Sequence, residues 1–407
     1  MKRSLAMLTL TTALVVAGGA FAQQMDKNVK IGVLNDQSSL YVDITGPGST
    51  LAAQMAVEDS GLNAKGWKVE VISADHQNKP DVGTNIARQW LDVEKVDAIA
   101  DVPTSSVALA VNNVIKEKNR VFLNSGAAAS DLTTTQCSPN TVHWTYDTYL
   151  LANGTGKALV KAGGDSWFFL TADYAFGHAL ERDTAAVVTT NGGKVLGVVR
   201  HPLNTSDFSS FLLQAQASKA KIIGLANAGG DTTNSIKQAS EFGIVSGGQK
   251  LAGLLLFISD IHALGLNTTQ GLNFTETFYW DLNDGTRAFS KRFSERMKNK
   301  AMPSMVQAGV YAATLHYLKA LEAMGGNPHE GVKVVEKMKS MPTDDPLFGK
   351  GKIRADGRKL HPGYLFEVKK PSESKGPWDY YKLIATIPAE EAFTPVDKSP
   401  CPLLKKS

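Results

Sequence analysis

Two short stretches combine hydroxyl side chains, small side chains and a helix start, the groups with which proteins hold a carboxylate. Thr104 and Ser105 stand in DVPTSS, and Gly126, Ala127 and Ala128 stand in NSGAAAS. Small residues leave backbone N–H groups open to a ligand, and the first turn of a helix adds a partial positive charge. The alternative is that the hydroxyls only cap the helix. Because two neighbouring loops share this composition, we expect a binding site for a ligand carboxylate.

Both stretches belong to one strand–helix–strand unit between Val96 and Thr133. Apolar runs at Ala98–Ala100 and Val121–Leu123 predict two buried strands, and the helix between them opens at Ser105. The apolar face of this helix carries Val107, Val111, Val114 and Ile115. Two strands flanking one helix make a βαβ unit, and ligands of such sheets bind beyond the carboxyl ends of the strands, where both loops lie.

Aromatic side chains stand at further loops of this kind. Directly after the apolar strand Trp167–Thr171 comes DYAFG, which places two rings at the carboxyl end of a strand. A half-polar ring at a loop suits the wet edge of a cleft and a flat or apolar ligand. Plain core packing is the alternative, and we favour it for Phe278. The remaining candidates for the ligand site, some of them polar or small, are Ser39, Tyr41, Tyr174, Phe176, Asn227, Ala228 and Trp280.

No motif for catalysis or metal binding is present in the sequence. GPGSTL at Gly46–Leu51 lacks the third glycine of a dinucleotide fingerprint, and the chain has no Walker A lysine and no G-x-S-x-G elbow. The eight histidines form no H-x-x-x-H or H-E-x-x-H pair, and His262 is interpreted as structural. We therefore predict a protein that is not an enzyme and that has no cofactor and no metal site.

The first 22 residues have the pattern of a secretory signal peptide. Lys2 and Arg3 precede an apolar run from Leu5 to Ala17, and Ala20-Phe21-Ala22 follows as a cleavage site. A single membrane anchor is the alternative, but the apolar run is too short to span a bilayer. Removing two positive charges takes the formal net charge from +4 to +2, which gives no reason to expect a nucleic-acid partner. We predict a periplasmic protein.

Cys137 and Cys401 are the only two cysteines of the chain. An exported chain has access to an oxidising compartment, so we predict that a disulfide pins the C-terminal tail to the loop around Thr135–Pro139. The two cysteines enclose most of the mature chain, and the loop-entropy model then gives a stabilisation on the order of 4–5 kcal/mol. Two free thiols are the alternative.

Strand and helix patterns alternate along the chain and predict two similar α/β lobes. Trp167–Thr171 repeats the character of Ile31–Leu34, and Lys221–Ala228 repeats that of Val96–Pro103. Helices between the strands imply parallel, doubly wound sheets. Further expected elements are a strand at Leu251–Ile258, a long helix at Met305–Met324 that stops at Gly325-Gly326, and a β-rich segment at Gly351–Ile387.

Together these pieces resemble the periplasmic solute-binding proteins of ABC importers, in particular the leucine/isoleucine/valine-binding (type I) family. The resemblance rests on IGVLND, DHQNKPDVGTNIAR, DVPTSS, LNSGAAASDLT, DYAFG and AGGDTTNSIKQASEFGI in this order. It implies two Rossmann-like lobes joined by a three-strand hinge, lobe one at 28–147 plus 277–352 and lobe two at 148–276 plus 353–407. It also implies a monomer that serves a permease in the inner membrane.

In relatives that bind α-amino acids, the carboxylate is held at the positions of Thr104, Ser105 and Gly126–Ala128. The resemblance implies three departures from the groups that hold the ammonium. The hydroxyl position is Ala128, the acidic position falls in Leu254–Leu256, and a tyrosine position near Asn227–Gly229 is small. A buried ammonium without partners would be heavily penalised.

We therefore expect a small, mostly apolar carboxylate, such as a benzoate or phenylpropenoate, and expect Trp280→Ala to weaken its binding at least tenfold. Three alternatives remain open: a binder of branched-chain amino acids or amides, a periplasmic sensor that reports to a signalling receptor, and a secreted enzyme.

Overall fold

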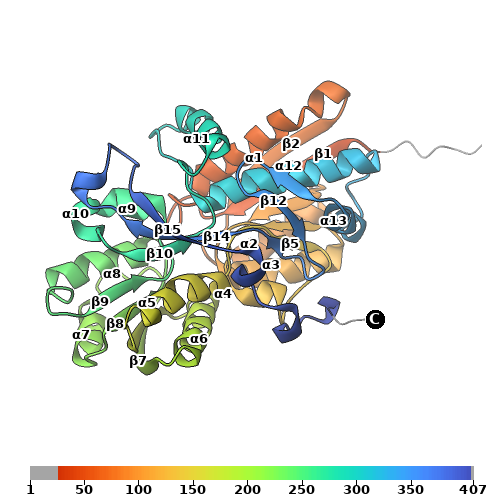
Figure 1. Cartoon of the computed structure of the whole chain (residues 1–407). Helices are drawn as coiled ribbons and strands as arrows, with labels where there is room; N and C mark the ends of the chain where they lie inside the picture. The colour runs from red at the N-terminus through yellow and green to blue at the C-terminus, as the bar shows by residue number, and fades with distance from the viewer. Residues whose placement is uncertain (1–25, 405–407) are drawn as a thin grey trace, which may run out of the picture.

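The computed structural model describes residues 26–404, so the predicted signal peptide at residues 1–22 lies outside the described residues. Two parallel sheets form the framework, one in each half of the molecule (Figure 1). We call the half with strand order β2-β1-β3-β4-β5 lobe one, and the half with strand order β7-β6-β8-β9 lobe two. The predicted pair of parallel α/β lobes is confirmed.

Lobe one has helices on both faces of its sheet. Ile99 and Phe122 share an apolar cluster with α2 and α3, whereas their neighbours Ala100 and Leu123 share another with α1 and α12. This is the alternation of side chains expected along buried strands. The elements are β1 (Asn28–Asn35), α1 (Gly46–Ser60), β2 (Lys68–Asp75), α2 (Pro80–Asp92), β3 (Ala98–Asp101), α3 (Ser105–Lys118), β4 (Val121–Asn124), β5 (Thr141–His143), α11 (Asp284–Arg296), α12 (Met305–Met324) and α13 (Gly331–Ser340).

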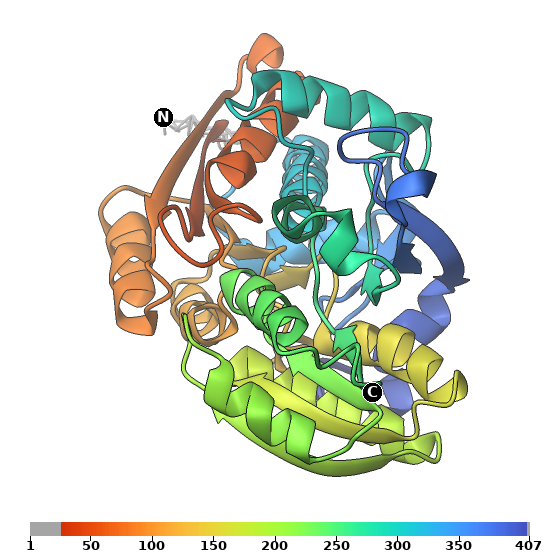
Figure 2. The ribbon, with the colours of Figure 1, turned by 90° about the vertical axis from the view of Figure 1, so that its left-hand side faces the viewer.

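Lobe two repeats this plan with four strands (Figure 2). Phe169 packs in one apolar cluster and its neighbour Leu170 in another, so both faces of this sheet are buried as well. The elements are α4 (Thr148–Leu151), a π-helical turn (Ala152–Gly156), α5 (Lys157–Lys161), β6 (Ser166–Ala172), α6 (Ala175–Thr190), β7 (Lys194–His201), α7 (Ser209–Ala217), β8 (Ile222–Ala226), α8 (Gly230–Glu241), β9 (Lys250–Gly253), α9 (Ile258–Leu264) and α10 (Leu266–Thr269).

Two small antiparallel sheets and the tail complete the fold. One sheet has the order β10-β14-β15 and the other β11-β12-β13. Their bounds are β10 (Asn273–Glu276), β11 (Thr343–Asp345), β12 (Gly349–Ile353), β13 (Lys359–Leu360), β14 (Gly363–Val368) and β15 (Tyr381–Ile387), and the tail contains α14 (Ala389–Ala392). Short 3-10 turns cover Asn63–Lys65, Ser130–Thr133, Pro371–Glu373, Val396–Lys398 and Pro402–Leu404. The lobe boundaries expected from the family stay a prediction.

The strand expected over Leu251–Ile258 is wrong in its second half. β9 ends at Gly253, where a Cβ atom would lie 2.3 Å from the side chain of Leu256, because the chain folds back on itself there. α9 then starts at Ile258, and the Asp260 carboxylate accepts the backbone N–H of Phe257 at 2.9 Å. A continuous apolar run of this length does not by itself distinguish a strand from a buried turn.

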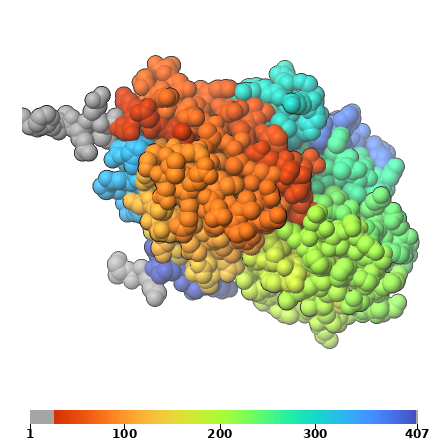
Figure 3. Space-filling model, turned by 180° about the vertical axis from the view of Figure 1, so that it is seen from behind, coloured from red at the N-terminus to blue at the C-terminus, as the bar shows by residue number. Residues whose placement is uncertain are grey.

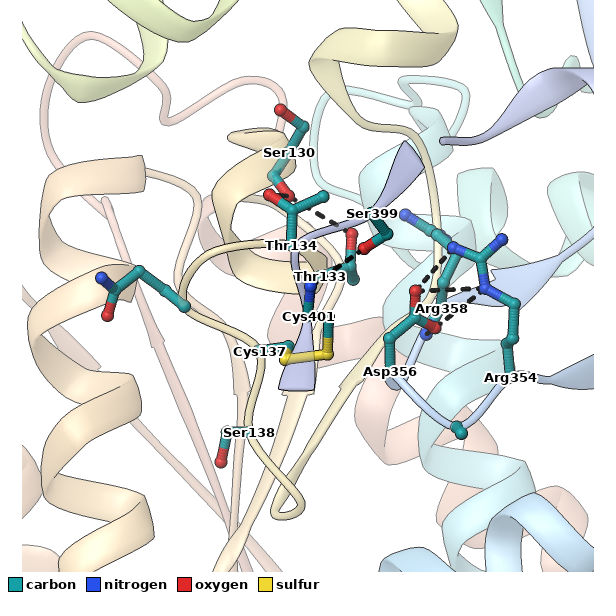
Figure 4. The surroundings of a disulfide bond; sticks show 12 residues. Ser130, Thr133, Thr134, Cys137, Ser138, Arg354, Asp356, Arg358, Ser399 and Cys401 are labelled. Carbon is teal, nitrogen blue, oxygen red and sulfur yellow. Dashed lines mark hydrogen bonds and ion pairs between the residues drawn. A yellow bond between two sulfur atoms is a disulfide. The ribbon is translucent and has the colours of Figure 1, made fainter. Parts of the chain in front are cut away.

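The predicted disulfide between Cys137 and Cys401 is confirmed (Figure 4). Their Cα atoms are 5.9 Å apart, and Cys401 is buried. The tail reaches this point across the junction of the lobes, where the backbone O of Glu391 accepts Asn153 Nδ2 at 2.8 Å and that of Thr394 accepts Arg354 Nη1 at 2.9 Å. Within residues 26–404, no helix has the length and apolarity needed to cross a membrane.

Candidate functional site

A small cavity lies between the lobes, at the carboxyl ends of their strands. Its volume is about 10 Å³, close to the space of a single water molecule. It is lined by Tyr41, Ile44, Pro103, Gly126, Ala128, Tyr146, Tyr174, Phe176, Ala228 and Leu255. Figure 3 shows lobe one, in orange, in contact with lobe two, in green, along one side of the molecule. The structure is therefore a closed form of the two lobes.

Among the direct contacts between the lobes, two lie beside the cavity. The hydroxyls of Tyr41, from lobe one, and Tyr174, from lobe two, are 2.5 Å apart. The backbone N–H of Gly230 donates to Leu40 O at 3.4 Å. Gly229 makes this approach possible, since it has φ +57° and a Cβ there would lie 2.6 Å from Leu40 O. Closure thus brings backbone and side-chain groups of both lobes together beside the cavity.

Three tyrosine hydroxyls are the main polar groups of the cavity wall. Tyr146 donates its hydroxyl to Gly126 O at 2.8 Å, while Tyr41 and Tyr174 pair with each other. Burial raises the pKa of all three hydroxyls above their ordinary value, so each one stays protonated and neutral. A neutral hydroxyl can both donate and accept a hydrogen bond. The wall can therefore hold a polar ligand group without supplying a charge.

Six of the twelve predicted ligand residues line this cavity: Tyr41, Gly126, Ala128, Tyr174, Phe176 and Ala228. Ala127 lies in the same loop as Gly126 and Ala128 but packs in the apolar cluster that contains residues of α2 and α3. Its backbone N–H donates to Asn124 Oδ1 at 3.0 Å. Asn227 is buried in lobe two, where Oδ1 accepts the Thr232 hydroxyl at 2.8 Å. The side chain of Trp280 donates its indole N–H to Trp378 O at 2.7 Å, away from the cavity.

The three predicted hydroxyl residues of lobe one bond to the protein itself. Thr104 donates to Asn78 Oδ1, and Ser105 Oγ accepts the backbone N–H of Ala129 at 3.2 Å. Ser39 Oγ bonds to Asp36 Oδ2 at 2.9 Å. Thr104 is the N-cap of α3 but makes no side-chain capping bond. The first-turn N–H groups of α3, next to the cavity-lining Pro103, are therefore not capped by this residue.

Ile44, Pro103, Tyr146 and Leu255 line the cavity but are absent from the predicted set. Tyr146 could have been found, because TYDTY follows β5, whose carboxyl end lies at the same edge of the sheet as those of β3 and β4. Leu255 lies within Leu254–Leu256, the segment in which the resemblance implies an acidic position. Ile44 carries no polar signal in the sequence, and its place depends on the loop fold between β1 and α1.

None of the ten lining residues is charged. On the lobe two side, the carboxyl of Asp231 acts electrostatically on both Tyr41 and Tyr174. Its two oxygens already accept the backbone N–H groups of Asn204 at 3.1 Å and Thr205 at 2.8 Å. Burial raises the pKa of this carboxyl to about 7. The cavity lining therefore offers an apolar wall, neutral hydroxyls and no charged side chain of its own.

Two parallel-sheet lobes that close over a small interlobe cavity define a binding protein of the type I periplasmic class. The family model described as periplasmic binding protein matches residues 28–376. This chain belongs to that family, as its sequence predicts.

Solved structures agree with this assignment. A periplasmic binding protein from Burkholderia mallei is 54% identical, with 93% of this chain and 100% of that chain covered and a TM-score of 0.90. A branched chain amino acid ABC transporter periplasmic ligand-binding protein from Burkholderia xenovorans is 40% identical, with 93% and 100% covered and a TM-score of 0.81. A solute binding protein from R. palustris, solved with benzoate, shares the fold at 21% identity, with 92% and 99% covered and a TM-score of 0.81.

The chain is thus a solute-binding protein of the periplasmic ABC-transporter class and not an enzyme. Proteins of this class bind small molecules and pair with a membrane permease. The expectation of a monomer stays a prediction.

Proposed function

We propose that this protein captures a small, mostly apolar carboxylate between its two lobes and delivers it to an ABC importer. The observation that carries this proposal is a cavity wall with apolar side chains, three neutral tyrosine hydroxyls and no charged residue. An apolar body would pack on Ile44, Phe176 and Leu255. Its carboxylate would accept hydrogen bonds from tyrosine hydroxyls and from the first turn of α3.

A cavity of about 10 Å³ does not hold such a ligand in the closed form described above. Binding therefore requires the lobes to part and the Tyr41–Tyr174 pair to separate. A ligand that touches both lobes then stabilises the closed arrangement by its difference in affinity for the two states. The permease would recognise that arrangement.

A branched-chain amino acid is the second candidate, because the relative from Burkholderia xenovorans is described as a transporter protein for that class. Its ammonium would need an acceptor in the cavity. The oxygens of Asp231 are occupied by backbone N–H groups, and Leu255 stands where the resemblance expects an acid. A buried ammonium without hydrogen-bond partners is strongly unfavourable.

Pairs of ligands with one skeleton test this proposal. We would measure thermal unfolding with 4-methylpentanoate against leucine, which differ by the ammonium, and with benzoate against benzamide, which differ by the carboxylate. A ligand at about 100 times its Kd stabilises the folded state by about 2.7 kcal/mol and raises Tm. We expect a shift with at least one of the two acids and none with leucine or benzamide. A shift with leucine and none with 4-methylpentanoate would show an amino-acid binder.

A further inference from the structure

Asp101 carries a buried carboxyl directly behind the cavity. This carboxyl has no role in the ligand capture described above. Asp101 is the last residue of β3 and has no exposed surface. Asp101 and Val102 have φ +78° and +54°, a left-handed conformation that costs a residue with a Cβ about 1–3 kcal/mol. Hydrogen bonds from Val102 N to Leu34 O and from Gly126 N to Asp101 O hold the chain there. The surrounding fold therefore keeps this carboxyl in place.

The carboxyl of Asp101 is only half satisfied. Its Oδ2 accepts Asn35 Nδ2 at 3.1 Å, whereas its Oδ1 forms no hydrogen bond of ordinary geometry, although the Ser49 hydroxyl lies near enough to act on the carboxyl. The Oδ1 of Asn35 is also buried without a donor. Two buried acceptors without donors are costly, and one proton on Asp101 would turn one of them into a donor. Burial raises the pKa of Asp101 to about 7, and hydrogen bonding to Ser49 and Asn35 offsets this effect only in part.

Asp101 lies directly behind Gly126, a residue of the cavity lining. A Cβ on Gly126 would lie 2.7 Å from Asp101 Oδ1 and 2.6 Å from Pro103 Cα, and both Gly126 and Pro103 line the cavity. Tyr146, whose hydroxyl bonds to Gly126 O, also has its pKa raised by burial and, less strongly, by the charge of Asp101. A charge on this carboxyl therefore acts on whatever occupies the site.

We infer that Asp101 determines which ligand charge the site accepts. The Asp101 carboxyl must carry a proton when a ligand carboxylate is bound. Each anion therefore binds together with one proton from solvent. This inference rests on the proposed function. Two carboxylates in a poorly solvated site cannot both be ionised cheaply. The bound anion then favours protonated Asp101, and an ionised Asp101 lowers the affinity for the anion.

The other ionisable groups near Asp101 are neutral or bond elsewhere. His143 on β5, two strands from Asp101, makes no side-chain hydrogen bond, and burial lowers its pKa so that the imidazole stays neutral. Tyr146 stays neutral, as described above. Asp36, which follows β1, accepts the backbone N–H of Tyr41 at 2.7 Å. On α12, which packs on β3, Tyr311 donates to Asp59 at 2.7 Å and His316 bonds to Met338 O at 2.9 Å. The strand β4 contains no ionisable side chain.

Proton uptake can be measured by calorimetric titration with 4-methylpentanoate or benzoate, in buffers of different ionisation enthalpy. Over roughly pH 6 to 8.5 both ligands are fully ionised. We expect the wild-type protein to take up close to one proton per ligand at the upper end. Its Kd should rise about tenfold per pH unit above pH ~7. Benzamide, if it binds, should cause no uptake.

The variant Asp101→Asn should abolish the uptake and flatten the pH profile, and at pH ~8.5 should bind the anion about 30-fold more tightly than the wild type. Asp231→Asn is the matched control, since that carboxyl also has a pKa of about 7, and it should keep the uptake. Uptake that persists in Asp101→Asn, or proton release by the wild type, would overturn the inference.

The wild-type measurement needs no variant of Asp101, so it can overturn the inference even if Asp101→Asn does not fold, and uptake that Asp231→Asn keeps supports it. Carboxylate binding without proton uptake overturns this inference alone. Absence of any carboxylate binding overturns the proposed function, and the inference with it.

Discussion

At the scale of single residues, the polar groups of the cavity wall are neutral phenol hydroxyls and not charged side chains. Tyr41 and Tyr174 come from different lobes, and their hydroxyls satisfy each other only when the lobes are closed. A ligand that inserts between them must offer a hydrogen-bonding group in return, because a buried hydroxyl without a partner costs about 1–3 kcal/mol. Such a pair selects for a ligand with a polar end and rejects a hydrocarbon.

Tyr174→Phe tests this role. The variant keeps the ring and removes a hydroxyl that donates to the ligand carboxylate in the proposed complex, so we expect the Kd for the bound acid to rise about tenfold. Titration calorimetry measures it. Tyr364→Phe removes a hydroxyl from β14, outside the cavity lining, and should leave Kd unchanged. Equal affinities of Tyr174→Phe and the wild type would remove this hydroxyl from the site.

The sequence predicts some site residues better than others, for physical reasons. Gly126, Ala128 and Tyr174 follow strands directly, and the position of a strand end is a local property. Thr104 also follows a strand, but its hydroxyl bonds to Asn78, which lies 26 residues earlier in the chain. The partner of a hydroxyl depends on how distant loops meet. Short-range patterns therefore identify the loops of the site but not which of their side chains face the ligand.

At the scale of elements, α12 shows which local signals are reliable. Its bounds, Met305–Met324, are those predicted from the sequence, and Gly325 ends the helix with φ +80°. Ser304 and Gln307 form a capping box at its start, and Ser304 also donates to Ile44 O at 2.7 Å. Ile44 lines the cavity. The cap of the central helix of lobe one thus also anchors the loop that carries part of the binding site.

Ser304→Ala should destabilise the fold through this cap. Loss of an N-cap hydroxyl costs about 1–2 kcal/mol, and Ile44 O loses its donor as well. We expect the free energy of unfolding in urea to fall by about 2 kcal/mol. Ser340→Ala is the control, since its hydroxyl bonds only within the exposed end of α13 and its loss should have little effect. Unchanged stability of Ser304→Ala would show that the cap is replaceable by water.

At the scale of the whole molecule, the regular α/β alternation predicts both lobes because each parallel sheet repeats one local unit. The exact limits of the lobes are not local in this sense. They depend on where β10, β14 and β15 pair across the junction, and antiparallel pairing between residues about 90 apart leaves no signal in either segment. The C-terminal tail is an example, since Cys401 near its end forms a disulfide with Cys137 of lobe one.

Removing the disulfide should lower the stability of the whole molecule. Cys137 and Cys401 are 264 residues apart, and closing a loop of that length stabilises the folded state by about 5 kcal/mol in the chain-entropy model. We expect Cys137→Ala/Cys401→Ala and the reduced wild type to unfold at the same, lower urea concentration. A reductant should not affect the double variant. Equal stability of the oxidised and reduced proteins would contradict this account.

The same bond gives the molecule an unusual mechanical response. Between Cys137 and Cys401 the chain is a covalent ring that contains the sheet of lobe two and the later helices of lobe one. Force applied to residues 26 and 404 can stretch only the segment outside this ring, a contour of about 400 Å at ~3.6 Å per residue. The ring stores a further contour of about 950 Å for its 264-residue span, which a single reduction event would release. In a pulling experiment, more than two thirds of residues 26–404 would thus be shielded from tension until that bond is reduced.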